Sequence, residues 1–287
     1  MAPRDSAVRI VVLAHDLLGT YGDLGNGIVL AARLRWRGHG AELVVHEGGT
    51  PVPASADLYL LGGGEDAPQS LAYAELAATD ALARALDAGA VLLGVCAGYQ
   101  LLGHRFRTTD GRDLPGFGLL DVETRPGEGV PRAVGEISVA PDPALGLPTL
   151  TGFENHGGRT YLGDGAQPLG RVVRGHGNNG TDGLEGVRRQ NMIGTYLGSG
   201  SRPLGHVLAG VGNTGVDGTE GAYSGRIVGT YLHGPVLVRN PALADLLLSW
   251  VVGPLGSLAE PEVDALRSER LTAVASTRRR RRSLRSR

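Results

Sequence analysis

The segment Leu92-Leu93-Gly94-Val95-Cys96-Ala97-Gly98-Tyr99-Gln100 joins an apolar run to a helix-like stretch and places the only cysteine of the chain at the junction. Residues 90–95 form the apolar run and residues 97–104 the helical pattern. Small residues two positions before and after Cys96 give the steric room that a sharp strand-to-helix turn requires. The thiol should then lie beside the positive end of a helix, which favours the thiolate. A lone cysteine is more often a small buried hydrophobic residue, but the Gly-x-Cys-x-Gly frame favours a nucleophile.

Outward from this turn, short apolar strands alternate with helical patterns. Strands are expected at residues 8–14, 41–46, 58–61 and 90–95, and helices at residues 26–37, 70–88 and 241–250. Such alternation predicts an α/β fold with a mostly parallel sheet and helices on both faces. Beyond residue 111 the sequence changes to short strands such as 118–124 and 134–140, rich in glycine and turns. We expect these to form β-hairpin insertions in the second half of the domain.

The second half also contains a tandem duplication. Thr-Tyr-Leu occurs at 160–162, 195–197 and 230–232, and residues 168–197 match residues 203–232 at 16 of 30 positions. A period of 35 residues is close to that of helical repeats, but the glycine content and the lack of helical periodicity argue against a solenoid. Residues 160–194 and 195–229 are therefore interpreted as two copies of one hairpin-and-loop unit, of which one is an extra surface excursion that can be deleted.

Composition restricts the class of protein. The chain has 287 residues, 41% of them hydrophobic, and no apolar run long enough to span a bilayer. One cysteine excludes an internal disulfide and fits a reducing cytoplasm, and no secretory signal is expected at the N-terminus. We expect one domain over residues 6–253 and a loosely ordered extension over 254–287. Residues 278–287 carry seven arginines, and without them the body has 21 basic and 29 acidic residues. Such a tail can contact nucleic acid or anionic lipid, but a disordered extension without a role is the simpler interpretation.

A cysteine nucleophile needs a base, which is usually a histidine. Two of the eight histidines lie in suggestive segments, His156 in Phe-Glu-Asn-His-Gly-Gly and His233 in Gly-Thr-Tyr-Leu-His-Gly-Pro. The first duplicated copy ends Gly-Thr-Tyr-Leu-Gly, with Gly198 at the position of His233. The local structure therefore does not require a histidine there, so His233 is the better candidate for the general base. His156 is interpreted as a structural residue.

An oxyanion needs backbone donors. The glycine run 62–64 follows a strand and places the N–H of Gly63 as one candidate, and the N–H of Ala97, next after Cys96, is the second. Glycine-rich loops also bind phosphate, but this run fits neither nucleotide-binding motif. No cluster of cysteines and histidines has metal-ligand spacing, so no metal is expected.

Together these motifs resemble class I glutamine amidotransferases over residues 8–253. Gly-Val-Cys-Ala-Gly-Tyr-Gln is similar to the nucleophile elbow of that family, and residues 229–234 resemble its cobyric acid synthase-like branch. Residues 17–26, 153–160, 175–179 and 240–245 resemble the glutaminase subunit (GatD type) of lipid II isoglutaminyl synthase.

The resemblance implies a reaction and a partner. Such a subunit hydrolyses L-glutamine and passes ammonia to a Mur-ligase-like subunit, which uses ATP and Mg²⁺ to amidate the D-glutamate α-carboxyl of lipid II in peptidoglycan synthesis. No cofactor is expected in this chain and no nucleic acid as a partner. The implied location is the cytoplasm, at the inner membrane face where lipid II is presented.

The resemblance also assigns roles. Cys96 would form a γ-glutamyl thioester and His233 would carry the proton. Arg132 matches the arginine that holds the substrate, because a guanidinium fits a carboxylate bidentately. Gly63, Ala97 and Gln100 would also bind the substrate.

One departure concerns the catalytic acid. The family triad continues His-x-Glu, whereas glycine and proline follow His233. An imidazole without an orienting carboxylate is a poor base, so the partner is expected to supply the acid. Two alternatives remain: amidation of another carboxylate, such as a cobyrinate-like substrate, and a non-catalytic regulatory subunit.

Overall fold

The fold is that of a computed structural model. It describes residues 6–127, 129, 131–180, 182–185, 187–189, 202–206, 219–223 and 226–272, with only the backbone described for 188–189, 202–206 and 219–223. The arginine tail and most of the second duplicated copy lie outside the described residues.

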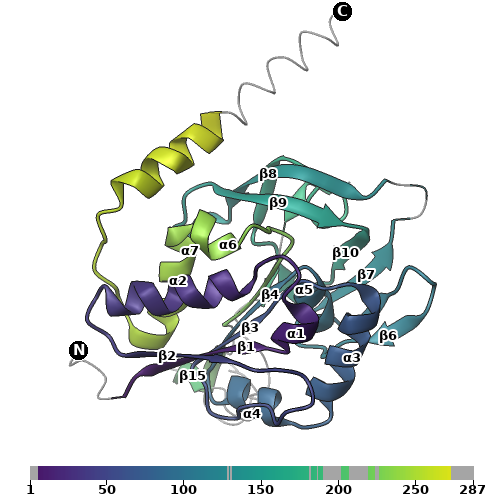
Figure 1. Ribbon diagram of the computed structural model, residues 1–287, viewed down its shortest axis with the longest axis horizontal. Helices are drawn as coiled ribbons and strands as arrows, with labels where there is room; N and C mark the ends of the chain where they lie inside the picture. The colour runs from purple at the N-terminus through teal and green to yellow at the C-terminus, as the bar shows by residue number, and fades with distance from the viewer. Residues whose placement is uncertain are drawn as a thin grey trace, which may run out of the picture.

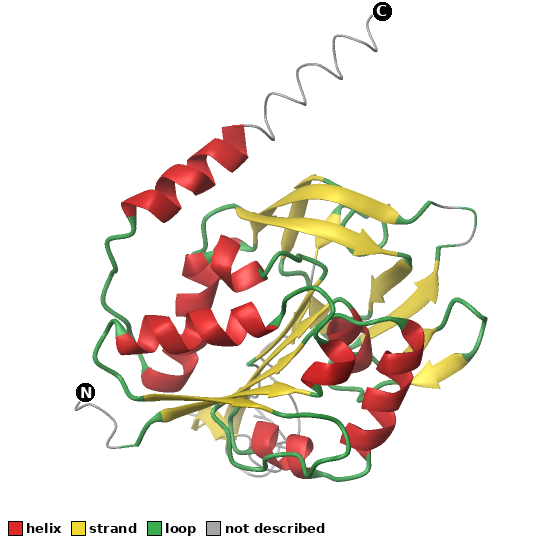
Figure 2. Ribbon diagram, viewed as in Figure 1, coloured by secondary structure: helices red, strands yellow, loops and turns green. Residues whose placement is uncertain are grey.

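The central element is a seven-stranded sheet whose strands come from the two halves of the chain (Figures 1 and 2). In spatial order its strands are β11 (Ala166–Gln167), β14 (Val187–Arg189), β17 (Ile227–Thr230), β4 (Val91–Val95), β3 (Leu58–Leu61), β1 (Val8–Leu13) and β2 (Ala41–Val45). The five strands from β17 to β2 are parallel, and β14 and β11 add antiparallel at one edge. Chain order reverses at β1, because β2 lies on one side of it and β3 on the other. Ligands of such sheets bind at the carboxyl ends of the strands near this reversal.

Helices cover both faces of the sheet, as predicted (Figure 1). Gly27 of α2 (Leu24–Arg35) lies against Leu60, and Gly98 of α5 (Ala97–Leu102) lies against Leu61. Neighbouring residues of a strand point to opposite faces, so these two helices pack on opposite sides. Beside α2 lie α6 (Val236–Arg239) and α7 (Pro241–Val252), and α3 (Asp66–Ala77) packs beside α1 (His15–Leu18) and α5.

The expected single helix over residues 70–88 is wrong. The structure has α3 followed by a separate α4 (Ala81–Asp87). The break falls at Thr79 and Asp80, and Asp80 has φ −89° and ψ 12° at the start of α4. Both residue types favour helix ends because their side chains compete for backbone hydrogen bonds.

Two further sheets form the expected β-rich second half: sheet B is mixed, because β5 and β7 are parallel, and sheet C is antiparallel. Sheet B, the first, contains β10 (Gly158–Leu162), β7 (Val122–Pro126), β5 (Arg105–Arg107) and β6 (Asp113–Pro115) in that order. Sheet C contains β13 (Leu184–Glu185), β12 (Gly170–Arg174), β8 (Ala133–Pro141) and β9 (Leu150–His156), with the 3₁₀ turn η1 (Pro143–Leu145) between β8 and β9.

The two duplicated copies are used differently. The first copy contributes β11 to β14, which pair with both the central sheet and sheet C. From the second copy, β15 (Arg202–His206) and β16 (Thr219–Tyr223) pair with each other and with no other described strand. The second copy nevertheless ends in β17, which lies inside the central sheet. The strands of the first copy and the last strand of the second copy are thus the ones that pair with the central sheet or with sheet C.

The described part of the C-terminal extension contacts the domain. Residues 261–272 are helical, and residues 254–272 are bonded to the domain at several points. Arg33 is buried and pairs with Asp245 at 2.7 Å and with Glu260 at 2.7 Å. Arg267 donates to the carbonyl of Arg239 at 3.0 Å. The described part of the extension is therefore held to the domain by the Arg33–Glu260 ion pair and by hydrogen bonds of Arg267.

Candidate active site

The predicted sharp turn at Cys96 is confirmed. Cys96 follows β4 directly and precedes α5, with φ 54° and ψ −108°. A Cβ on Gly94 would lie 2.9 Å from the backbone of Gly98, and one on Gly98 would lie 2.7 Å from the carbonyl carbon of Leu61. Larger residues at either position would force the backbone apart. The two glycines therefore permit a conformation that few other sequences allow.

The expectation of a thiolate at rest is wrong. Cys96 is only 6% exposed, and burial raises the pKa of its thiol to about 12, with the negative charge of Asp23 acting in the same direction. The N–H of Ala97 opposes this shift by bonding to the sulfur. Because α5 is only six residues long, its dipole does not outweigh the loss of water. The resting thiol is neutral.

His233 lies at the same edge of the sheet. Val95 and Thr230 are registered neighbours on β4 and β17, and the N–H of Cys96 donates to the carbonyl of Thr230 at 2.9 Å. Cys96 comes one residue after Val95 and His233 three residues after Thr230, so both follow the same paired position of the two strands. The backbone of His233 is fixed by Phe153, whose carbonyl accepts its N–H at 2.9 Å.

The ring of His233 has no orienting group in the described part of the chain. It is 3% exposed, and neither ring nitrogen has a hydrogen-bond partner there. The ring packs against Tyr21, with ring centroids 4.6 Å apart. Burial, and then the positive charge of Arg132, lower the pKa of His233 to about 4. At neutral pH the imidazole is uncharged and its orientation is not fixed by a hydrogen bond.

Arg132 lies close enough to act on the same groups. Its Nε donates to Oδ1 of Asn155 at 2.7 Å and its Nη2 to the Asn155 carbonyl at 3.1 Å. Its charge lowers the pKa of His233 and opposes the upward shift at Cys96. The guanidinium is exposed, which suits an approaching carboxylate; its role in binding glutamine stays a prediction.

The two N–H groups predicted to bind the oxyanion have different hydrogen-bond partners in the structure. The N–H of Ala97 faces the sulfur of Cys96, whereas the N–H of Gly63 donates to Oδ2 of Asp23 at 2.7 Å. Gly63 is close to the histidine, because a Cβ there would lie 3.4 Å from Cε1 of His233. The Gly63 donor thus becomes available to a substrate only when Asp23 releases it.

Asp23 is a site residue that the sequence reasoning missed. It is buried at the start of α2, and burial raises its pKa to about 6, opposed by the Gly63 hydrogen bond. Asn26 also donates to it, at 3.3 Å. The only sequence signal was its place in residues 17–26, since burial of a carboxylate cannot be read from local spacing.

Gln100 is engaged within the protein. Its Oε1 accepts from Gln69 at 3.0 Å and its Nε2 donates to the hydroxyl of Tyr231 at 3.1 Å. The Tyr231 hydroxyl also bonds Thr160 at 2.7 Å. This network positions the segment that leads to His233, and substrate binding by Gln100 stays a prediction.

His156 packs on the same tyrosine. Its ring stacks on Tyr231 with centroids 3.7 Å apart and planes 9° apart, and its Nδ1 bonds the carbonyl of Gly158 at 2.9 Å. Burial lowers the pKa of His156 to about 3. These contacts are those of a structural residue.

A strained cysteine at a strand-to-helix turn, with a histidine at the end of the neighbouring strand, is the arrangement of a thiol-dependent amidohydrolase. Residues 9–198 match the CobB/CobQ-like glutamine amidotransferase domain. The chain belongs to this family. It is 38% identical over 182 residues to the lipid II isoglutaminyl synthase (glutamine-hydrolyzing) subunit GatD of Staphylococcus aureus, covering 63% of this chain and 72% of the relative.

Two further relatives place the amidotransferase within the family. The GatD subunit of Streptococcus pneumoniae is 33% identical over 190 residues, covering 66% of this chain and 72% of that protein. A cobyric acid synthase from Pelotomaculum thermopropionicum is 38% identical over 154 residues, but this covers only 29% of that protein. The chain thus spans most of the GatD subunits and under a third of the synthase.

Neither a metal site nor a membrane-spanning helix is found among the described residues. No group of three or more histidines, cysteines or carboxylates there could hold a metal ion. None of the described helices is long and apolar enough to cross a membrane.

Proposed function

We propose that this amidotransferase hydrolyses L-glutamine and delivers the ammonia to a Mur-ligase-like partner that amidates the D-glutamate α-carboxyl of lipid II. The observation that carries the proposal is the pairing of Cys96, in its strained turn, with His233 at the end of the adjacent parallel strand. The similarity to two GatD subunits over most of their length supports the acceptor.

In the first half of the reaction the Cys96 sulfur attacks the side-chain carbonyl carbon of glutamine. The thiol proton passes to His233 as the carbon–sulfur bond forms. The carbon–nitrogen bond then breaks, and the proton moves from His233 to the departing ammonia. Arg132 holds the substrate α-carboxylate, and the N–H of Ala97 stabilises the oxyanion.

In the second half water attacks the γ-glutamyl thioester. His233 takes a proton from this water as the new carbon–oxygen bond forms, and the carbon–sulfur bond breaks. The proton returns to the sulfur, which restores the neutral thiol and releases glutamate. His233 thus serves as base and then as acid in each half.

The resting site is poorly prepared for this chemistry alone. The thiol pKa lies far above neutrality and the imidazole pKa far below it, so proton transfer between them is unfavourable. A carboxylate placed against the free ring nitrogen of His233 would orient the imidazole and raise its pKa. We infer that the partner supplies this carboxylate, together with the ATP and Mg²⁺ used in amidation. Because lipid II is amidated on its cytoplasmic side, the complex works in the cytoplasm at the inner membrane face.

The test is glutamate release by the isolated chain and by the chain with its Mur-ligase-like partner. We expect the partner to raise the rate by orders of magnitude, and a Cys96→Ala variant in the same complex to be inactive. Full activity of the isolated chain would contradict the need for a partner carboxylate. Release of glutamate with cobyrinate amidation, but without lipid II amidation, would favour the synthase-like alternative.

A further inference from the structure

We propose that the outer face of sheet B holds a second ligand site, which binds a pyrophosphate group. The inference goes beyond the proposed function, because the site shares no side chain with the thiol site. It rests on an arginine cluster built by strands that are distant in sequence.

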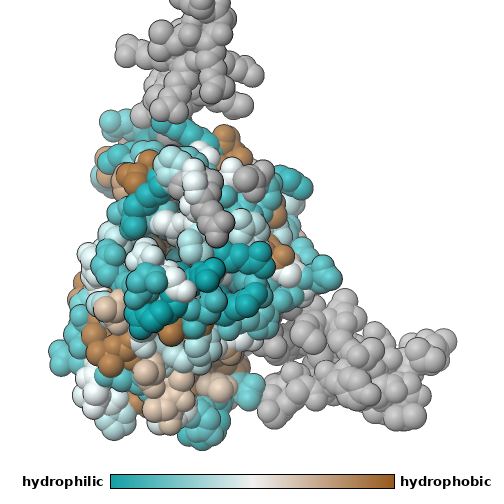
Figure 3. Space-filling model, turned by 90° about the vertical axis from the view of Figure 1, so that its right-hand side faces the viewer, coloured by the Kyte–Doolittle hydropathy of each residue, from teal (hydrophilic) through white to brown (hydrophobic). Residues whose placement is uncertain are grey.

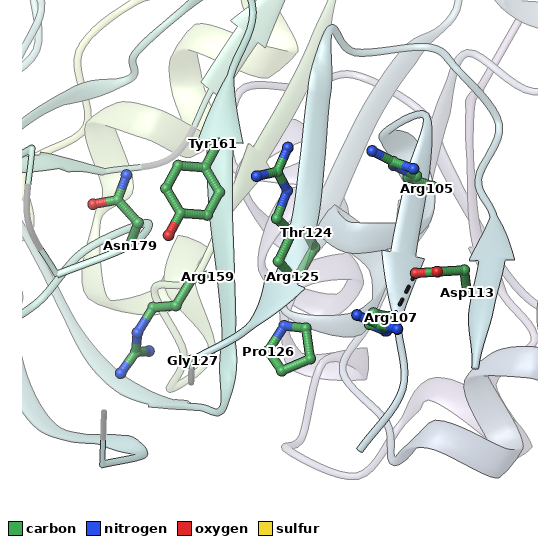
Figure 4. A pocket seen from close by; sticks show the side chains of 10 residues that line it. All are labelled: Arg105, Arg107, Asp113, Thr124, Arg125, Pro126, Gly127, Arg159, Tyr161 and Asn179. Atoms are coloured by element: carbon green, nitrogen blue, oxygen red, sulfur yellow. Dashed lines mark ion pairs between the residues drawn. The ribbon is translucent and has the colours of Figure 1, made fainter. Parts of the chain in front are cut away.

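The alternation of side chains along the strands creates the cluster. Arg105 and Arg107 lie two residues apart on β5 and therefore share one face. On β7 and β10 the same face carries Arg125 and Arg159, while Thr124 and Thr160 point inward and bond each other at 2.8 Å. Figure 4 shows the four arginines around one cavity.

The register brings two like charges together. Arg125 and Arg159 are directly opposite each other in the antiparallel pair of β7 and β10. Like charges at opposed positions destabilise a sheet. Arg125 pairs with Glu123 at 2.9 Å, but the same Glu123 oxygen also accepts from Arg105 at 3.0 Å. The single carboxylate of Glu123 therefore forms ion pairs with two guanidinium groups.

Arg159 is the most unusual member of the cluster. Its side chain is 1% exposed, and within the described part of the chain it donates hydrogen bonds only to backbone carbonyls, including that of Pro131 at 2.6 Å. Its Nε has no hydrogen-bond partner. Within the described residues no carboxylate pairs with it. A buried guanidinium is costly without an opposite charge, so this position indicates an anion.

The charge and size of the cavity indicate which anion. Among the described residues, Arg105 and Arg125 pair with Glu123, Arg107 lies 3.6 Å from Asp113, and Arg159 pairs with no carboxylate, so four guanidinium groups have two carboxylates as partners. The excess of two positive charges matches a polyanionic phosphate better than a single carboxylate. The cavity has a volume of about 410 Å³, within the usual range for small ligands. Arginine forks suit phosphate oxygens because each donates two parallel hydrogen bonds.

The surroundings leave the cavity open to a ligand. In Figure 3 the face that carries β6, β7 and β10 is turned to the viewer, and its centre is strongly hydrophilic. Tyr161 borders the cavity and lies 5.4 Å beneath the guanidinium of Arg125. This contact holds Arg125 in place on the outer side.

Isothermal titration with inorganic pyrophosphate at low ionic strength tests the site. We expect saturable binding that weakens about tenfold in Arg125→Gln and in Arg159→Lys, since each loses charged hydrogen bonds. Arg84→Gln is the matched control, because Arg84 is exposed on α4 and pairs only with Asp80 within the described residues. Thermal melting checks that each variant is folded, and Arg125→Gln keeps the test decisive if Arg159→Lys unfolds.

A second arm distinguishes free from lipid-linked pyrophosphate. Flotation with phosphatidylcholine vesicles containing a polyprenyl pyrophosphate should carry the wild-type chain and not Arg125→Gln if the headgroup is the ligand. Binding of inorganic pyrophosphate without flotation would assign the site to a soluble ligand. Equal pyrophosphate affinity in Arg125→Gln and Arg84→Gln would overturn the proposal.

Discussion

The thiol site and the arginine pocket lie on opposite sides of β10 and treat charge in opposite ways. On the inner side, burial leaves Cys96 protonated and His233 and His156 uncharged. On the outer side, three of the four arginines pair with Asp113 or Glu123, and the buried Arg159 pairs with no carboxylate of the described residues. The inner groups can change protonation when a substrate or partner arrives, whereas arginine cannot lose its charge. The difference suits proton transfer on one side and anion binding on the other.

The largest effect should come from Cys96→Ala. Loss of the nucleophile should lower partner-stimulated glutamine hydrolysis by at least about 10³-fold, while the affinity for pyrophosphate stays that of the wild type. Glutamate release and calorimetry on one preparation measure both. A coupled loss of pyrophosphate binding would show that the two regions form one site.

Two glycine substitutions compare how tightly each region is built. Gly98→Ala should lower the free energy of unfolding by about 3 kcal/mol, because the new Cβ meets the backbone at Leu61. Gly127→Ala borders the arginine pocket, where the nearest atom is Nε of Arg159 at 3.3 Å. A side chain can yield, so we expect a loss below about 1 kcal/mol. Urea denaturation measures both free energies of unfolding. Equal losses in the two variants would show that the two regions are packed equally tightly.

Acid should destabilise the protein through the inner groups. The folded pKa of His156 is lowered to about 3 from 6.5, so its contribution is complete above pH 6.5 and is lost as the pH falls below that value. Each such histidine adds a slope of about 1.4 kcal/mol per pH unit within this window.

The comparison of wild type with His156→Asn isolates this slope. Asp23 titrates in the opposite sense, because its folded pKa is raised to about 6, but it is common to both proteins. We expect the variant to lose less stability between pH 6.5 and 4.5 in urea titrations. Parallel curves would show that His156 is not the buried neutral group described here.

The smallest effect should come from deleting residues 190–224, one period of the duplication. Arg189 of β14 would then connect through Gly225 and Arg226 to Ile227 of β17, and these two strands are already antiparallel neighbours. A two-residue hairpin closes such a pair. We expect a change within about 2 kcal/mol in the free energy of unfolding, with hydrolysis and pyrophosphate binding retained. Failure of this variant to fold would contradict the prediction that one copy of the duplication can be deleted.

Much of the fold could be predicted because its signals are local. The strand at residues 58–61 was predicted with the bounds of β3, and the strained turn followed from the two glycines around Cys96. The break between α3 and α4 was missed because the alanine-rich composition concealed the helix-ending residues at 79 and 80. The antiparallel addition of β14 beside β17 was also missed, because strand pairing across 40 residues has no local signature.

The sequence by itself determined the sharp turn at Cys96 and the family, and it predicted Cys96 as the nucleophile and His233 rather than His156 as its base. These depend on steric demands and motifs within a few residues of each position. The tertiary structure alone decided that the Cys96 thiol is neutral at rest, that Asp23 occupies the Gly63 donor, and that four arginines from three strands meet. Protonation and charge clustering depend on burial and on neighbours distant in the chain, and a linear pattern specifies neither.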